Sequence, residues 1–160
     1  MTFDAAPEAK NSAAAITTRR AREADLEEVD FIEQASFADP WGRCEFSTAL
    51  ESPHTLFLVA DDGSGAVCGY VIALAVADES EILNLAVTPE CRGVGLGRAL
   101  LDAAIDAARA KGAAQVWLEV RDSNAAARRL YESRGFSEIS KRRRYYRHPV
   151  EDALVLKLAI

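Results

Sequence analysis

Three polar residues in the second half of the chain have types and spacings that could support acid–base chemistry. Glu119 lies in the alternating stretch 115–120, so it falls on the less apolar face of a predicted strand, near its end. Asn124 and Tyr131 follow, seven residues apart, on one face of a predicted helix. The three side chains could act as base, binder and acid. Spacing alone also allows a solvated carboxylate, a helix N-cap and a packed aromatic ring.

A glycine-rich turn over residues 92–97 joins a predicted strand, 81–87, to a long predicted helix that ends near Lys111. Glycines permit close approach of a ligand, and the free amides at a helix start suit a pyrophosphate. Arg92 and Arg98 add cationic donors. The turn fits neither the Walker loop nor the dinucleotide fingerprint. It does match Arg/Gln-x-x-Gly-x-Gly/Ala, the acetyl-CoA signature of GNAT enzymes. A turn that serves only helix packing is the alternative.

The elements that must position these residues can be predicted along the whole chain. Strands are expected at 16–20, 55–60, 67–77, 81–87, 115–120, 136–146 and 153–158. Helices are expected at 25–36, 43–51, about 97–111 and 124–134, the last with Gly135 as its C-cap. The pattern indicates an α/β fold, a mixed twisted sheet of about six to seven strands flanked by about four helices. Residues 1–15 are expected to form a flexible tail before a domain over 16–160.

Composition limits the classes of function. A chain of 160 residues suits one core, and its net charge of −6 argues against a general nucleic-acid binder. Cys44, Cys68 and Cys91 are too widely spaced for a disulfide framework or a zinc site, so no metal is expected. The longest apolar stretch, 70–77, is too short to span a membrane. The expected compartment is the cytoplasm.

Two longer segments resemble motifs of the GNAT superfamily. Residues 84–89 with 92–101 are similar to its motif A, and residues 117–121 with 123–136 are similar to motif B of the RimI type. Pro40-Trp41, Arg143-Arg144-Tyr145-Tyr146 and Glu151-Asp152-Ala153 agree with the same group of enzymes, the ribosomal-protein-alanine N-acetyltransferases. The resemblance runs from about residue 16 to residue 158 and implies a single GNAT, or acyl-CoA N-acyltransferase, domain.

The resemblance implies a role for each matching residue. Glu119 would be the general base, and Tyr131 would be the general acid that protonates the CoA thiolate. Trp41, Tyr145 and Tyr146 would contact the acceptor. The residues implied to hold acetyl-CoA are Leu85, Ala86, Val87, Arg92, Gly93, Val94, Gly95, Leu96, Gly97, Arg98 and Asn124.

The acceptor implied is a protein N-terminus, the N-terminal alanine of a small-subunit ribosomal protein, and the expected state is a monomer or weak dimer. An α-amine has a pKa of about 7.7–8.0, so a modest base suffices for its direct attack on the thioester. A lysine side chain or a small-molecule amine is the alternative acceptor. A remoter alternative is an RNA-binding accessory protein, because residues 141–147 mix basic and aromatic side chains. A further alternative is a regulatory module that binds CoA but has no catalytic activity.

Overall fold

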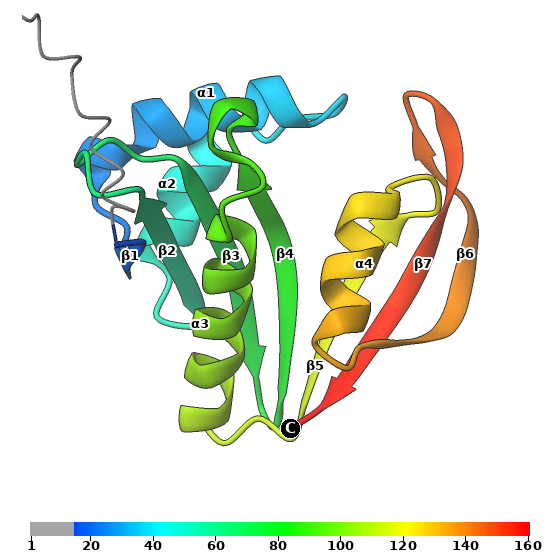
Figure 1. Ribbon diagram of the computed structural model, residues 1–160. Coiled ribbons are helices and arrows are strands. Elements are labelled where there is room, and N and C mark those ends of the chain that lie inside the picture. Colours follow the sequence, from blue (N-terminus) through cyan, green and yellow to red (C-terminus); the bar gives the residue numbers. More distant parts are fainter. Residues whose placement is uncertain (1–14) are drawn as a thin grey trace, which may run out of the picture.

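A seven-stranded sheet runs through residues 15–160, the part of the chain that the computed structural model describes (Figure 1). Its order is β1-β2-β3-β4-β5-β7-β6, with β4 and β5 parallel and every other neighbouring pair antiparallel. The strands are β1 (Thr17–Arg20), β2 (Thr55–Asp61), β3 (Gly69–Val76), β4 (Glu79–Val87), β5 (Gln115–Arg121), β6 (Ser137–Arg147) and β7 (Val150–Ala159). This confirms the predicted mixed α/β fold.

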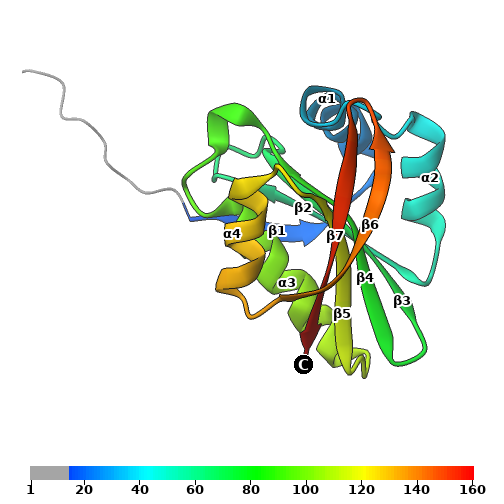
Figure 2. The same ribbon diagram turned by 90° about the vertical axis from the view of Figure 1, so that its right-hand side faces the viewer.

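Helices cover the two faces of the sheet (Figures 1 and 2). On one face lie α1 (Leu26–Ser36) and α2 (Arg43–Glu51), and on the other lie α3 (Leu96–Ala110) and α4 (Ala125–Ser133). Short 3-10 helices precede α1 and α3, at η1 (Glu23–Asp25) and η2 (Pro89–Cys91). None of the helices within residues 15–160 is long and apolar enough to cross a membrane.

Each face of the sheet has its own hydrophobic core. Along β2 the side chains alternate, so Leu56 and Leu58 join the core beneath α3, while Phe57 and Val59 join the core beneath α1 and α2. Burial of apolar surface on both faces is the main stabilising contribution to this layered arrangement.

The predicted elements are present, with small differences at their ends. The clearest difference is β7, which begins at Val150 and not at Ala153, because Val150 and Glu151 pair with Arg147 and Tyr146 of β6. The predicted tail, 1–15, lies outside the described residues except for its last residue, and it stays a prediction.

The two parallel strands at the centre of the sheet, β4 and β5, diverge along their length. Pairing joins only residues 79–82 of β4 to residues 115–118 of β5, and past Ile82 and Leu118 the two strands separate (Figure 1). A bulge contributes, because Ile72 of β3 faces Asn84 and Ala73 faces Ile82, which leaves Leu83 as an extra residue. A bulge bends its strand and increases the local twist. The second halves of β4 and β5 are therefore open to side chains and ligands.

Candidate active site

Two cavities lie where β4 and β5 diverge. The first, of about 410 Å³, is lined by the second halves of both strands, the end of α1 with the loop after it, and Tyr145 and Tyr146. The second, of about 470 Å³, is lined by the end of β4, the glycine turn and α4. Residues that line both cavities are Ser36, Phe37, Leu85, Asn124, Ala127 and Tyr131. Groups bound in the two cavities can therefore meet at this shared wall.

The glycine turn forms the start of α3 as the sequence predicts. Gly93 and Gly95 have φ values of 80° and 90°, in the left-handed region that glycine adopts without steric cost. Gly95 is the N-cap residue, so the amides of the first turn after it have no carbonyl partner within the helix. A Cβ at Gly97 would lie 3.6 Å from Leu130, so a larger residue there would narrow the second cavity.

Every predicted cofactor residue but one lines this second cavity. The exception is Val94, whose side chain is 60% exposed and does not line the cavity, so a role for Val94 in holding the cofactor stays a prediction. Arg92 is held beside the cavity by a hydrogen bond that its Nε donates to the carbonyl of Val87, at 3.0 Å.

Tyr131 and Asn124 each combine a structural position with a place at the shared wall. Tyr131 is buried, and its ring packs edge-on against Phe136 at 5.8 Å between centroids. Burial, with a smaller contribution from Tyr146, raises the pKa of Tyr131 above its ordinary value, so its hydroxyl keeps its proton at neutral pH. Asn124 is the N-cap of α4, where its Oδ1 accepts the Ala127 amide at 3.1 Å. Both residues line both cavities.

Glu119 lies in the first cavity, among other polar groups. The alternation along β5 is as predicted, with its neighbours Leu118 and Val120 buried. Its Oε1 lies 2.8 Å from Nε of Arg142, and a hydrogen bond to Glu119 raises the pKa of Tyr145. Burial and then the charge of Glu119 raise the pKa of Glu81, a second carboxyl group in this cavity. An amine entering the cavity would thus meet carboxyl groups of both β4 and β5.

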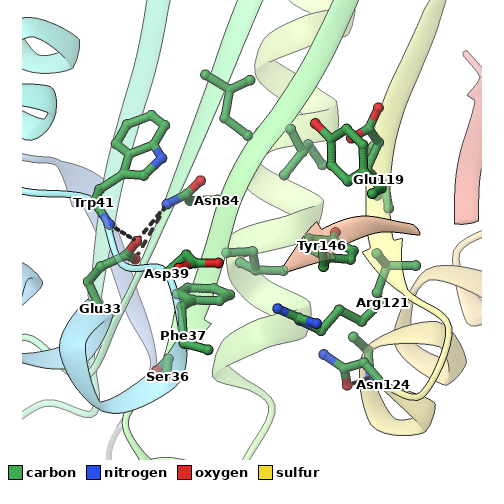
Figure 3. Close-up of a pocket in the computed structure, with 18 of the residues that line it drawn as sticks. Glu33, Ser36, Phe37, Asp39, Trp41, Asn84, Glu119, Arg121, Asn124 and Tyr146 are labelled. Atoms are coloured by element: carbon green, nitrogen blue, oxygen red, sulfur yellow. Dashed lines mark hydrogen bonds between the residues drawn. The ribbon is translucent and has the colours of Figure 1, made fainter. Parts of the chain in front are cut away.

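The wall beside Glu119 is aromatic and cationic (Figure 3). The rings of Tyr145 and Tyr146 meet edge-on at 5.2 Å between centroids, and the guanidinium of Arg121 lies 4.2 Å from the centre of the Tyr146 ring. Burial, then the charge of Glu119, raises the pKa of Tyr146 to about 12. The predicted acceptor residue Trp41 lines the same cavity.

Glu33 is a site residue that the sequence analysis missed. It is 1% exposed, and its Oε1 accepts the Trp41 amide at 2.8 Å and the Asn84 side-chain amide at 3.1 Å (Figure 3). The Tyr70 hydroxyl donates to Oε2. Burial raises the pKa of Glu33, and the Trp41 and Asn84 hydrogen bonds oppose that rise. The signal was available, because Glu33 lies seven residues after Leu26 on the apolar face of the predicted helix.

The basic and aromatic segment 141–147 forms the C-terminal part of β6, which lies at one edge of the sheet. Two of its cations pair with carboxylates of the same domain: Lys141 with Asp122 at 3.3 Å, and Arg142 with Glu119. Its two tyrosines line the first cavity. These contacts place the segment at the border of that cavity.

The tertiary structure also brings together Asp62, Cys68 and Cys91, whose side-chain oxygen and sulfur atoms lie within 4.8 Å of one another. Burial, followed by the hydrogen bond and charge of Cys91, raises the pKa of the Cys68 thiol to about 12. Metal ligation needs the thiolate, which this environment disfavours. The proximity of these three groups does not by itself make them a metal site.

Comparison with known proteins identifies the class. Residues 25–136 match the model of the acetyltransferase (GNAT) family. The chain belongs to this family and is an acetyltransferase.

Relatives found by sequence comparison indicate which group of enzymes within this family the chain resembles. It is 41% identical over 140 residues to the [ribosomal protein bS18]-alanine N-acetyltransferase of Escherichia coli K12, covering 85% of this chain and 92% of that enzyme. A second relative, of the same name, from Haemophilus influenzae is 35% identical over 136 residues, covering 82% and 90% of the two chains.

Solved structures to which the chain is similar include an enzyme of the same kind as these sequence relatives. The crystal structure of the E. coli ribosomal-protein-S18-alanine N-acetyltransferase superposes with a TM-score of 0.84 at 38% identity, covering 91% of this chain and 94% of that one. Ard1 from Thermoplasma volcanium superposes with the same TM-score of 0.84 at 28% identity, covering 91% and 98%.

Proposed function

We propose that this enzyme transfers the acetyl group of acetyl-CoA to the N-terminal α-amine of a protein, and that the acceptor is the N-terminal alanine of a small-subunit ribosomal protein. The observation that carries the proposal is the meeting of the two cavities at Tyr131, with Glu119 in the first cavity and the glycine turn at the second. The relatives named as bS18-alanine N-acetyltransferases support the choice of acceptor.

The second cavity suits CoA. The diphosphate of CoA is an anion, and the free amides at the start of α3 with Arg92 and Arg98 offer it hydrogen bonds and positive charge. Leu85, Ala86 and Val87 lie on the part of β4 that has left β5. The Val87 carbonyl accepts Nε of Arg92, and the other backbone groups on that edge are free to bond the amides of the pantetheine arm. The bound thioester supplies an activated acetyl group close to the shared wall.

The first cavity suits the amine. Glu119 would take a proton from the acceptor as the amine nitrogen bonds to the thioester carbonyl carbon. The carbon–sulfur bond then breaks, and the Tyr131 hydroxyl would supply the proton that the departing thiolate needs. A tyrosine hydroxyl is protonated at neutral pH, which is the form that this step needs. Neither step requires a covalent bond between enzyme and acetyl group.

Trp41, Tyr145 and Tyr146 would contact the first residues of the acceptor, since all three line the first cavity. The proposed compartment is the cytoplasm, which the three free cysteines support. A monomer or weak dimer stays our prediction.

Mass spectrometry of peptides incubated with enzyme and acetyl-CoA tests the proposal. The panel should vary the N-terminal residue and include an α-blocked peptide with an internal lysine. We expect acetylation of the α-nitrogen of peptides that begin with alanine. Acetylation confined to lysine would replace the proposed acceptor by a side-chain amine. Calorimetry that shows no binding of CoA or acetyl-CoA would reject the assignment of the second cavity.

A further inference from the structure

Tyr145 and Tyr146 are neighbours in sequence, yet both line the first cavity. In a regular strand, successive side chains point to opposite faces, so one of the two would point away. The register of β6 on β7 resolves this: Arg142 lies opposite Ala153 and Tyr146 lies opposite Glu151. Residues 143–145 of β6 thus face the single residue Asp152 of β7, and this bulge breaks the alternation.

The bulge contains a backbone conformation that arginine rarely adopts. Arg144 has a φ of 52°, in the left-handed region where a Cβ crowds the following carbonyl. Its amide donates a hydrogen bond to Oδ1 of Asp152, at 2.8 Å. Asp152 is itself tied to the loop after β5, because its carbonyl accepts the amide of Asp122 at 3.1 Å. A carboxylate on a paired strand therefore holds the left-handed residue in place.

Side chains on both sides of Arg144 converge on β5. Before it, Arg142 lies opposite Ala153 of β7, and its Nε lies 2.8 Å from Oε1 of Glu119, which lies opposite Val155 of the same strand. After it, Tyr145 lies close enough to Glu119 for that carboxylate to raise the pKa of the tyrosine, and the ring centre of Tyr146 lies 4.2 Å from the guanidinium of Arg121. A regular β6 could not point both tyrosines to this face.

We infer that Asp152 is a positioning residue for the acceptor: its hydrogen bond to the Arg144 amide sets the bulge that turns Tyr145 and Tyr146 toward the first cavity. The inference rests on the proposed function, in which this cavity receives the acceptor. Asp152 acts through the backbone of β6 and does not line the cavity.

Steady-state kinetics of Asp152→Ala tests the inference. We expect the KM for an N-terminal alanine peptide to rise by about tenfold, the typical result of losing a hydrogen bond to a charged group, while the CoA affinity measured by calorimetry stays unchanged. Asp152→Asn keeps Oδ1 as an acceptor and should restore most of the peptide affinity. A matched control is Asp61→Ala, which removes a similar bond, from the Gly63 amide at 2.7 Å, in the turn after β2. That control should leave both the KM and the CoA affinity unchanged.

A second variant keeps the test valid if Asp152→Ala does not fold. Glycine adopts positive φ freely, so the double variant Asp152→Ala/Arg144→Gly should form the bulge without the carboxylate and recover a peptide KM near that of the wild type. A raised peptide KM in a folded double variant overturns the inference. So does a wild-type KM in Asp152→Ala, or a parallel loss of CoA affinity. Absence of peptide acetylation by the wild-type enzyme would instead reject the proposed function.

Discussion

Nε of Arg142 lies 2.8 Å from Oε1 of Glu119, so the proposed general base is already paired with a cation from its own domain. The ammonium form of an acceptor would compete with this guanidinium for the same carboxylate. Because Arg142 is itself more than half exposed, it can move aside at modest electrostatic cost. Entry of the acceptor would therefore displace Arg142 from the Glu119 carboxylate.

Replacement of Glu119 by Gln should lower kcat/KM for the peptide by about 100-fold or more, because glutamine cannot take a proton from the amine. We also expect the pH dependence of kcat/KM to flatten. Rate measurements across pH check this, and Arg142→Ala is the companion variant, since it removes the cation but keeps the base. A wild-type pH profile in Glu119→Gln would exclude Glu119 as the base.

Replacement of Tyr131 by Phe should lower kcat by about 100-fold or more while CoA affinity is retained, since only the hydroxyl is lost. The ring contact with Phe136 is kept, so folding should be preserved. Turnover measured beside calorimetry with CoA separates the two effects. Undiminished turnover would show that the thiolate obtains its proton elsewhere.

Gly95→Val should weaken CoA binding, because valine at a φ of 90° strains the start of α3 by about 1–2 kcal/mol and displaces its free amides. Gly112→Val is the matched control: Gly112 also has a positive φ, of 86°, but it follows the other end of α3. Both variants should lose stability in urea denaturation, and only Gly95→Val should bind CoA more weakly. Equal CoA affinities would count against the assignment of the turn.

Glu33→Ala should lower the free energy of unfolding by about 3 kcal/mol or more, because it leaves donors of Trp41, Tyr70 and Asn84 without their acceptor, at about 1–3 kcal/mol for each. Tyr70→Phe removes only one donor and should cost about 1 kcal/mol. Urea denaturation measures both. The KM for the peptide should also rise in Glu33→Ala, since Trp41 and Asn84 line the first cavity. Similar stabilities of the two variants would contradict the shared role of Glu33.

The ion pair between Arg19 and Asp25 should make the free energy of unfolding depend on pH in the acid range. Arg19 donates to both oxygens of Asp25, at 2.7 and 2.8 Å, and this hydrogen bonding lowers the pKa of Asp25 against the effect of burial. Since the folded pKa lies below the unfolded value of about 3.9, the stabilisation is full above that pH and is lost as pH falls through the folded pKa.

Asp25→Asn should therefore lose about 1–3 kcal/mol of unfolding free energy at pH 7, and this difference from the wild type should shrink in acid. Urea denaturation at pH 7 and at successively lower pH provides the measurement. A difference that is constant with pH would mean that the carboxylate charge of Asp25 does not contribute.

Local patterns were enough to predict where several residues of the candidate site lie in the fold. Alternation along β5 put Glu119 on its polar face, and the spacing of seven put Asn124 and Tyr131 on one helix face. The glycine turn predicted the open helix start, because left-handed residues and free amides are properties of a few consecutive residues. Strand period, helix period and turn chemistry act over short stretches of chain, so they can be recognised without the fold.

Only the tertiary structure decided which distant groups meet. Glu33 is separated from Tyr70 by 37 residues and from Asn84 by 51, and nothing local to any of them predicts their contact. The bulge of β6, which brings both tyrosines to one face, depends on its register against β7 and on the carboxylate of Asp152. Strand register and burial result from packing of the whole sheet, because each long-range contact is stabilised by neighbours that residue spacing does not specify.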